Sequence, residues 1–142
     1  MHRAFPVDAV EYLGPVFGAI VFITAMAFVT EPARQRFNAM LVGGAMGAYL
    51  SGGLGPWELA FAACGFVVAY QGLRSYRFIG IACLMHSAWD LVHHLFGNAI
   101  WPFMPTSSFG CMIFDALIAL WFFGGAPSFF DVEREAVEQR PS

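Results

Sequence analysis

Histidine and aspartate recur at helical spacing in the segment His86–His94, which reads His-Ser-Ala-Trp-Asp-Leu-Val-His-His. A helix turns by about 100° per residue, so Asp90, His93 and His94 fall within about 80° of His86 on one helix face. Imidazole and carboxylate groups at such spacings are the usual metal ligands of helical bundles. The segment therefore predicts a metal site, and we expect the ion to be a divalent transition metal, Zn or Fe.

Two further carboxylates, Glu58 and Asp115, lie inside apolar stretches of the chain. An acidic side chain near the centre of a bilayer costs roughly 2.5–3.5 kcal/mol, so such groups are normally paired, cavity-facing or functional. We predict that Asp115 joins the four residues of the histidine-rich segment as a metal ligand. We also predict that Glu58 is a catalytic residue that shuttles a proton.

The pattern leaves several arrangements and roles open. Because His86 and His94 are about 12 Å apart along a helix axis, Asp90 could bridge two ions about 3.5–4 Å apart, and one Zn site built from three ligands is equally compatible. An enzyme of this kind would use metal-bound water on an ester or amide of a lipid-like substrate, or activate oxygen with Fe. The same groups could instead form a structural hydrogen-bonded network or line a proton, ion or metal pathway.

The composition indicates the environment of these groups. Of the 142 residues, 58% are hydrophobic and 12% are charged, whereas about 25% of the residues of a soluble domain are charged. All seven cations are arginine, and long apolar stretches recur along the chain. These features exclude a water-soluble globule, a disordered chain and a nucleic-acid binder, and they predict an integral membrane protein whose partners are membrane lipids.

The apolar stretches predict an all-α, polytopic transmembrane helix bundle of five helices. A helix needs about 20 residues to cross the hydrocarbon core of a membrane. The second and fifth segments have about 17 residues each, so they could be partly re-entrant. The helices form a single transmembrane domain over residues 1–130, and residues 131–142 form a short cytoplasmic tail. The five predicted spans are Val10–Val29, Asn38–Leu54, Trp57–Leu73, Phe78–Gly97 and Phe109–Gly124.

The distribution of arginine among the loops predicts the orientation of the bundle in the membrane. The first and third loops each contain two arginines, and the second and fourth loops contain no cation. Because cytoplasmic loops are enriched in cations, we expect the first loop, the third loop and the C-terminus in the cytoplasm and the N-terminus outside. Ala25-Met-Ala27 has the form of a signal-peptide cleavage site, but acidic Asp8 and Glu11 precede the apolar run and favour an uncleaved helix. The loop arginines are Arg34, Arg36, Arg74 and Arg77.

Small residues at four-residue spacing predict close helix packing in the second span. Lipid provides no hydrophobic drive between helices, so glycines that let backbones approach favour association. We expect this helix to pack inside the monomer against Gly14 and Gly18 of the first span, while homo-oligomerisation through the same glycines stays open. The small residues of the second span are Gly43, Gly44, Gly47 and Ala48.

The fourth loop, residues 98–108, is apolar, aromatic and rich in proline. Trp101 and Phe103 are typical of anchors at a membrane interface. A functional interpretation makes the same loop a lid over the polar cluster.

Five motifs are distributed along nearly the whole chain. They are Glu31–Asn38, Gly47–Gly55, Gly72–Gly80, His86–His94 and Pro105–Gly110. In these motifs the chain resembles a family of small bacterial integral membrane proteins of unknown function. The resemblance implies a protein of the bacterial inner membrane and implies no activity. The histidine-rich segment also faintly resembles the histidine boxes of membrane desaturases and hydroxylases, which use more histidines spread over several segments.

Overall fold

The structure is a computed structural model that describes residues 8–50 and 52–130. Within these ranges the chain forms five helices and no strand, so the all-α prediction with five helices is confirmed. The predicted tail, residues 131–142, lies outside the described residues. The helices are α1 (Ala9–Ala27), α2 (Ala33–Ala45), α3 (Pro56–Gln71), α4 (Tyr76–Phe96) and α5 (Ser107–Phe123).

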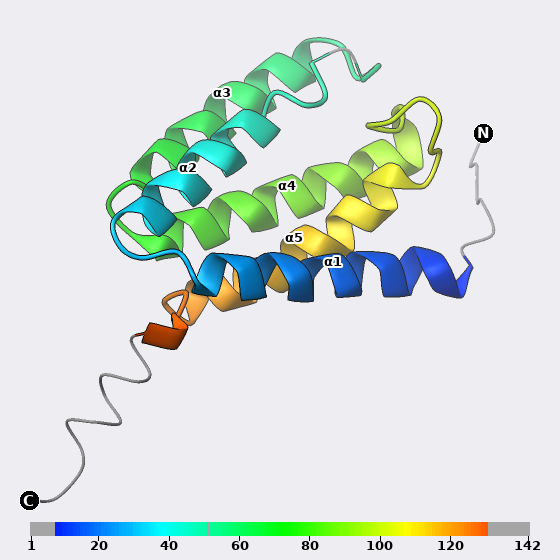
Figure 1. Ribbon diagram of the computed structural model, residues 1–142. Coiled ribbons are helices and arrows are strands. Elements are labelled where there is room, and N and C mark those ends of the chain that lie inside the picture. Colours follow the sequence, from blue (N-terminus) through cyan, green and yellow to red (C-terminus); the bar gives the residue numbers. More distant parts are fainter. Residues whose placement is uncertain (1–7, 51, 131–142) are drawn as a thin grey trace, which may run out of the picture.

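Successive helices run in alternating directions (Figure 1). The α1–α2 and α3–α4 connections therefore lie at one end of the bundle together with the end of α5, and the α2–α3 and α4–α5 connections lie at the other. Helix α4 is central, because it packs against α5 on one side and against α2 and α3 on another. Helix α1 packs mainly against α5.

The predicted second span, Asn38–Leu54, is wrong in its bounds. Helix α2 begins at Ala33 and ends at Ala45, and turns follow over residues 46–50. Its 13 residues give a length of about 20 Å, which is short of the roughly 30 Å of a hydrocarbon core. The helix ends where glycine becomes frequent, because glycine in a helix costs about 1 kcal/mol relative to alanine.

The predicted pairing of glycines between α1 and α2 is also wrong. Gly18 of α1 faces Phe114 of α5, whereas Gly43 of α2 faces Ala69 and Phe66 of α3. Aromatic side chains of α5 occupy the groove beside α1, with the rings of Phe22 and Phe114 5.6 Å apart. Within the chain, the packing partners of α2 are α3 and α4.

Helix α1 is long and apolar enough to cross a membrane, and among the described helices no other meets both conditions. Only 6% of the apolar window of α1 is buried, which distinguishes it from the core helix of a soluble protein. Helix α5 is apolar but shorter.

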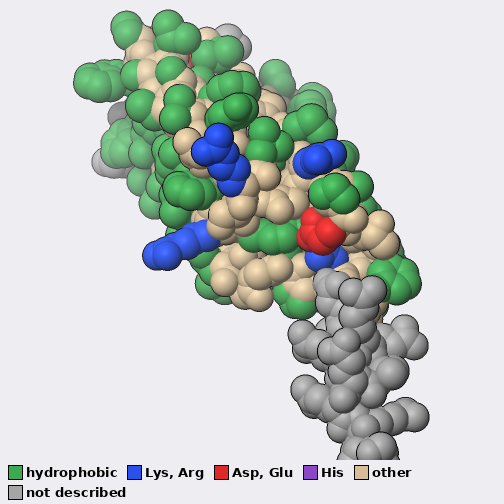
Figure 2. Space-filling view, turned by 90° about the vertical axis from the view of Figure 1, so that its left-hand side faces the viewer, with side chains coloured by type: hydrophobic (Ala, Val, Ile, Leu, Met, Phe, Trp, Pro, Cys, Tyr) green, Lys and Arg blue, Asp and Glu red, His purple; other side chains and the backbone are tan. Residues whose placement is uncertain are grey.

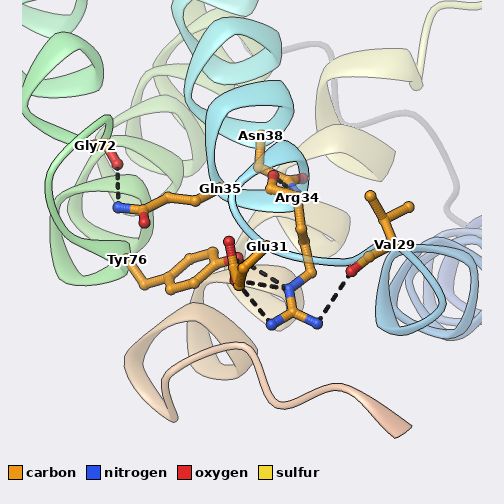
Figure 3. A network of polar contacts seen from close by, with 7 residues as sticks. All are labelled: Val29, Glu31, Arg34, Gln35, Asn38, Gly72 and Tyr76. Atoms are coloured by element: carbon orange, nitrogen blue, oxygen red, sulfur yellow. Dashed lines mark hydrogen bonds and ion pairs between the residues drawn. The ribbon is translucent and has the colours of Figure 1, made fainter. Parts of the chain in front are cut away.

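A polar network joins the α1–α2 connection to the start of α4 (Figure 3). The Arg34 side chain is 3% exposed. Its Nη2 atom lies 2.8 Å from Glu31 Oε1, and its Nε atom donates to the Tyr76 hydroxyl at 2.9 Å. The Tyr76 hydroxyl in turn donates to Glu31. Figure 2 looks onto this end of the bundle, where arginine side chains lie among hydrophobic ones.

We predict that Tyr76→Phe destabilises this end of the bundle. The substitution keeps the ring beside Phe122, 5.9 Å away, and removes only the hydroxyl. Since both hydrogen-bond partners of that hydroxyl are charged, the free energy of unfolding should fall by about 1.5–3 kcal/mol. Denaturant unfolding in detergent measures the change. An unchanged midpoint would show that the Arg34–Glu31 pair holds this end without Tyr76.

Candidate metal centre

Three side chains from two helices converge at the middle of the bundle. His86 and Asp90 lie one turn apart on α4, and Asp115 faces them from α5. The Nδ1 atom of His86 lies 2.7 Å from Asp115 Oδ2 and 3.3 Å from Asp90 Oδ2. One ligand atom from each residue lies within 4.8 Å of the other two, which is a spacing that one metal ion can bridge.

The hydrogen bond on the far side of the His86 ring determines the tautomer of a neutral imidazole. The Nε2 atom lies 3.0 Å from the carbonyl oxygen of Ala45. A carbonyl only accepts, so Nε2 carries a hydrogen and donates it. In the neutral ring Nδ1 then has a lone pair, and this lone pair faces the two carboxylates. Such an arrangement requires a cation or a proton between the three groups.

Tyr49 orients Asp90. Its hydroxyl donates to Asp90 Oδ1 at 2.6 Å, and the other carboxylate oxygen, Asp90 Oδ2, faces His86 Nδ1. The carboxylate is fully buried. Sequence reasoning did not assign Tyr49 a role, although it stands in the glycine-rich motif Gly47–Gly55. The available signal was the presence of a phenol in that motif.

The other two predicted ligands do not join this group. His93 stacks on Tyr49, with ring centroids 3.7 Å apart, and the ring of His94 lies 5.3 Å from that of Phe109. The physical reason is the helical rise, because seven or eight residues place them about 10–12 Å along the axis from His86. Of the five predicted metal ligands, the structure brings together His86, Asp90 and Asp115.

The carboxylate of Glu58 has a structural partner for each oxygen. Oε2 accepts from the backbone N–H of Gly52 at 2.9 Å, and Oε1 accepts from that of Leu54 at 2.6 Å. Glu58 is 3% exposed, in the first turn of α3. These bonds fix the turn before α3, and they account for the burial of this carboxylate without proton transfer.

A cavity of about 710 Å³ lies at the end of the bundle toward which α4 runs. Residues of the turn after α2, the end of α4 and the 98–105 loop line it, among them Tyr49, His93 and His94. Tyr49 therefore borders the cavity and also contacts the cluster of His86, Asp90 and Asp115 through Asp90.

Comparison with known proteins places the chain in a family by a family model. No curated protein and no solved structure matches the chain. A model of a family of unknown function, DUF6010, matches residues 10–128, which include His86, Asp90, Asp115 and Tyr49. Because the match covers most of the sequence, the chain belongs to DUF6010, a family of unknown function.

Proposed function

We propose that this chain is a multi-pass protein of the inner membrane that holds a divalent transition metal, Zn or Fe, at His86, Asp90 and Asp115. The observation that carries the proposal is the His86 ring, with Nε2 bonded to a carbonyl and Nδ1 beside two carboxylates. Metal-binding histidines usually donate their second ring N–H to such a partner. A neutral imidazole and two carboxylates sum to a charge of about −2, which a divalent ion balances in a buried site.

The ligand set favours catalysis over a closed structural site. Three protein ligands leave a coordination position open, as in catalytic zinc centres. A metal bound here would supply an activated water for hydrolysis or, as Fe, a centre for oxygen activation. We propose a lipid-like substrate, because the cluster lies within a bundle whose helices expose large apolar side chains.

The distribution of charge supports a membrane-spanning orientation. The described arginines lie at or beside the α1–α2 and α3–α4 connections, and acidic Asp8, Glu11 and Glu58 lie at the opposite end. Because cytoplasmic loops are enriched in cations, the end of the bundle that contains the arginines lies in the cytoplasm and the N-terminus lies outside. The cluster and the 710 Å³ cavity then lie between the middle of the bundle and the outer surface.

A membrane-impermeant thiol reagent tests this orientation. Cysteine placed at exposed Ala33 or Arg36, in a variant without the native cysteines, should react only after the cytoplasmic side is opened. Cysteine at Phe103, which is exposed in the α4–α5 connection, should react in intact spheroplasts. The reverse pattern at both positions would contradict the orientation.

A through-going ion pathway is not favoured by the packing. On α4 and α5, the buried side chains that follow the cluster toward the arginine end are apolar, apart from one thiol, and they form the main core. An ion path would need polar groups or water there. These residues are Ile79, Ala82, Cys83, Ile118, Ala119 and Phe122. Buried Asn38 of α2 lies at the same end and donates to the backbone carbonyl of Arg34.

Elemental analysis tests the metal proposal directly. Protein purified in detergent without chelator should contain about one Zn or Fe ion per chain, since one three-ligand group holds one ion. Dialysis against a chelator should remove it, and re-addition should restore it. Protein that contains no stoichiometric transition metal, and takes up none, would favour a structural hydrogen-bonded network of the same residues.

A further inference from the structure

A second cavity, of about 390 Å³, lies between α1 and α5. Its volume falls in the range of about 300–1,000 Å³ that is usual for ligand sites. Gly14 and Pro15 of α1 line it on one side, and Gly110 and Phe114 of α5 line it on the other. A Cβ atom at Gly14 would have no neighbour within 4 Å, so the space beside this glycine is open. The two cavities share no lining residue among those described.

This second cavity is polar at one end and apolar along the rest of its length. Helices α1 and α5 begin at the same end of the bundle (Figure 1). Glu11 and Thr106 line the cavity at this end, whereas Gly14 and Phe114 line it one to two turns further along the helices. A ligand that fills the cavity therefore needs a polar head and an apolar body, arranged along the axes of the two helices.

Charge and aromatic groups at the polar end determine which head fits. The carboxylate of Glu11 lines the cavity, Asp8 lies beside it, and the described part of this end contains no arginine, so a cation is favoured over an anion. Trp101 also lines the cavity, and its backbone N–H is fixed by a hydrogen bond to Ser107 Oγ at 3.0 Å. Aromatic faces attract quaternary ammonium groups through their negative charge density. A carboxylate and an indole together therefore suit a cationic nitrogen.

We infer that this cavity binds a cationic amphiphile, with its charged nitrogen at Glu11 and Trp101 and its apolar chain between α1 and α5 beside Gly14. The chain would reach the level of the candidate metal centre, because Cys111 lines the cavity and precedes Asp115 by one turn on α5. The inference rests on the proposed function only where it treats this amphiphile as the lipid-like substrate.

Protection of Cys111 from a thiol reagent tests the inference, because this partly exposed thiol lines the cavity. The protein in a neutral detergent is treated with N-ethylmaleimide, and peptide mass spectrometry gives the rate of modification at each cysteine. Dodecyltrimethylammonium should slow the modification of Cys111 in a saturable way, whereas exposed Cys64 of α3 should react at an unchanged rate. Dodecanoate, which has an anionic head, should need at least about tenfold higher concentrations for the same protection.

A zwitterionic lysolipid identifies the source of the cation. Protection of Cys111 by 1-dodecanoyl-glycerophosphocholine, at concentrations similar to those of dodecyltrimethylammonium, would identify a lipid headgroup. Protection by dodecyltrimethylammonium alone would identify a free cationic amphiphile.

Two variants test the two ends of the cavity. Glu11→Gln removes the charge and keeps an oxygen that can accept from the backbone N–H of Asp8, and it should raise the half-protecting concentration of dodecyltrimethylammonium by at least about tenfold. Gly14→Leu places a side chain in the open space, so it should slow the modification of Cys111 without any ligand and remove further protection. Gly44→Leu of α2, which also has no neighbour within 4 Å, should behave like wild type.

The third cysteine reports whether each variant is folded. Cys83 is 1% exposed and should stay unmodified in a folded protein. Equal protection of Cys111 and Cys64, or equal potency of dodecanoate and dodecyltrimethylammonium on the wild type, would overturn the inference. So would wild-type protection in folded Glu11→Gln or Gly14→Leu. None of these measurements requires a bound metal, so failure of this inference and failure of the metal proposal are distinguishable.

Discussion

His86→Gln is expected to abolish stoichiometric metal binding. The substitution removes Nδ1, which is the one nitrogen among the proposed ligand atoms, and the glutamine amide cannot contact the Ala45 carbonyl and both carboxylates from the same position. Loss of an outer-shell partner alone typically costs 10–100-fold in affinity, and loss of a ligand should cost about 100-fold or more. Metal content by elemental analysis should therefore fall from about one ion per chain to less than about a tenth of one.

Two other variants test whether the loss of metal is specific to the residues of the cluster. Asp115→Asn should lose the metal in the same way, because it removes a charged oxygen 2.7 Å from His86 Nδ1. His94→Gln changes a neighbouring histidine of the same helix that lies outside the cluster, and it should retain the metal. If His94→Gln lost the metal and His86→Gln kept it, the assignment of the ligands would be wrong.

Tyr49→Phe tests whether Tyr49 only orients the proposed ligand Asp90. The phenylalanine ring keeps the stacking on His93 and removes the hydrogen bond to Asp90 Oδ1. Metal should still bind, with an affinity lower by about 10–100-fold, as for other outer-shell partners. Titration with a competing chelator measures this affinity, and complete loss of binding would make Tyr49 more than a positioning residue.

Gly72→Ala is expected to produce a large loss of stability. A Cβ atom on Gly72 would lie 2.7 Å from the carbonyl oxygen of Ala69 and 2.7 Å from Cγ1 of buried Ile79. Neither neighbour can move easily, because one is backbone and the other lies in the main core. Overpacking of this kind costs about 1–3 kcal/mol and occasionally more, and denaturant unfolding in detergent, followed by circular dichroism, measures it.

Gly44→Ala is the matched control for Gly72→Ala. Gly44 lies in α2, and a Cβ atom there would have no neighbour within 4 Å. Alanine should therefore leave stability unchanged or raise it by up to about 1 kcal/mol through helix propensity. Equal destabilisation by both variants would indicate that Gly44 has a neighbour outside the described chain, as the predicted homo-oligomer contact requires.

The sequence by itself determined the helical class, the number of helices and part of the cluster of His86, Asp90 and Asp115. Apolar stretches with polar and proline-containing breaks predicted all five helices, because helix formation and burial depend on local composition. His86 and Asp90 were predictable for the same reason, since a four-residue spacing on one helix fixes their relative position. Asp115 was recognised as an acidic residue in an apolar stretch, which is a costly placement that indicates a buried partner.

The tertiary structure decided which of the candidate residues meet. The sequence gives the face of a residue on its own helix, but the register between two helices depends on the packing of many side chains. That register places Asp115, and not His93 or His94, beside His86. Only the fold showed that α2 ends at Ala45, which brings the Ala45 carbonyl to His86 and the Tyr49 hydroxyl to Asp90. These contacts join residues about 40 positions apart, and local periodicity contains no information about such distant contacts.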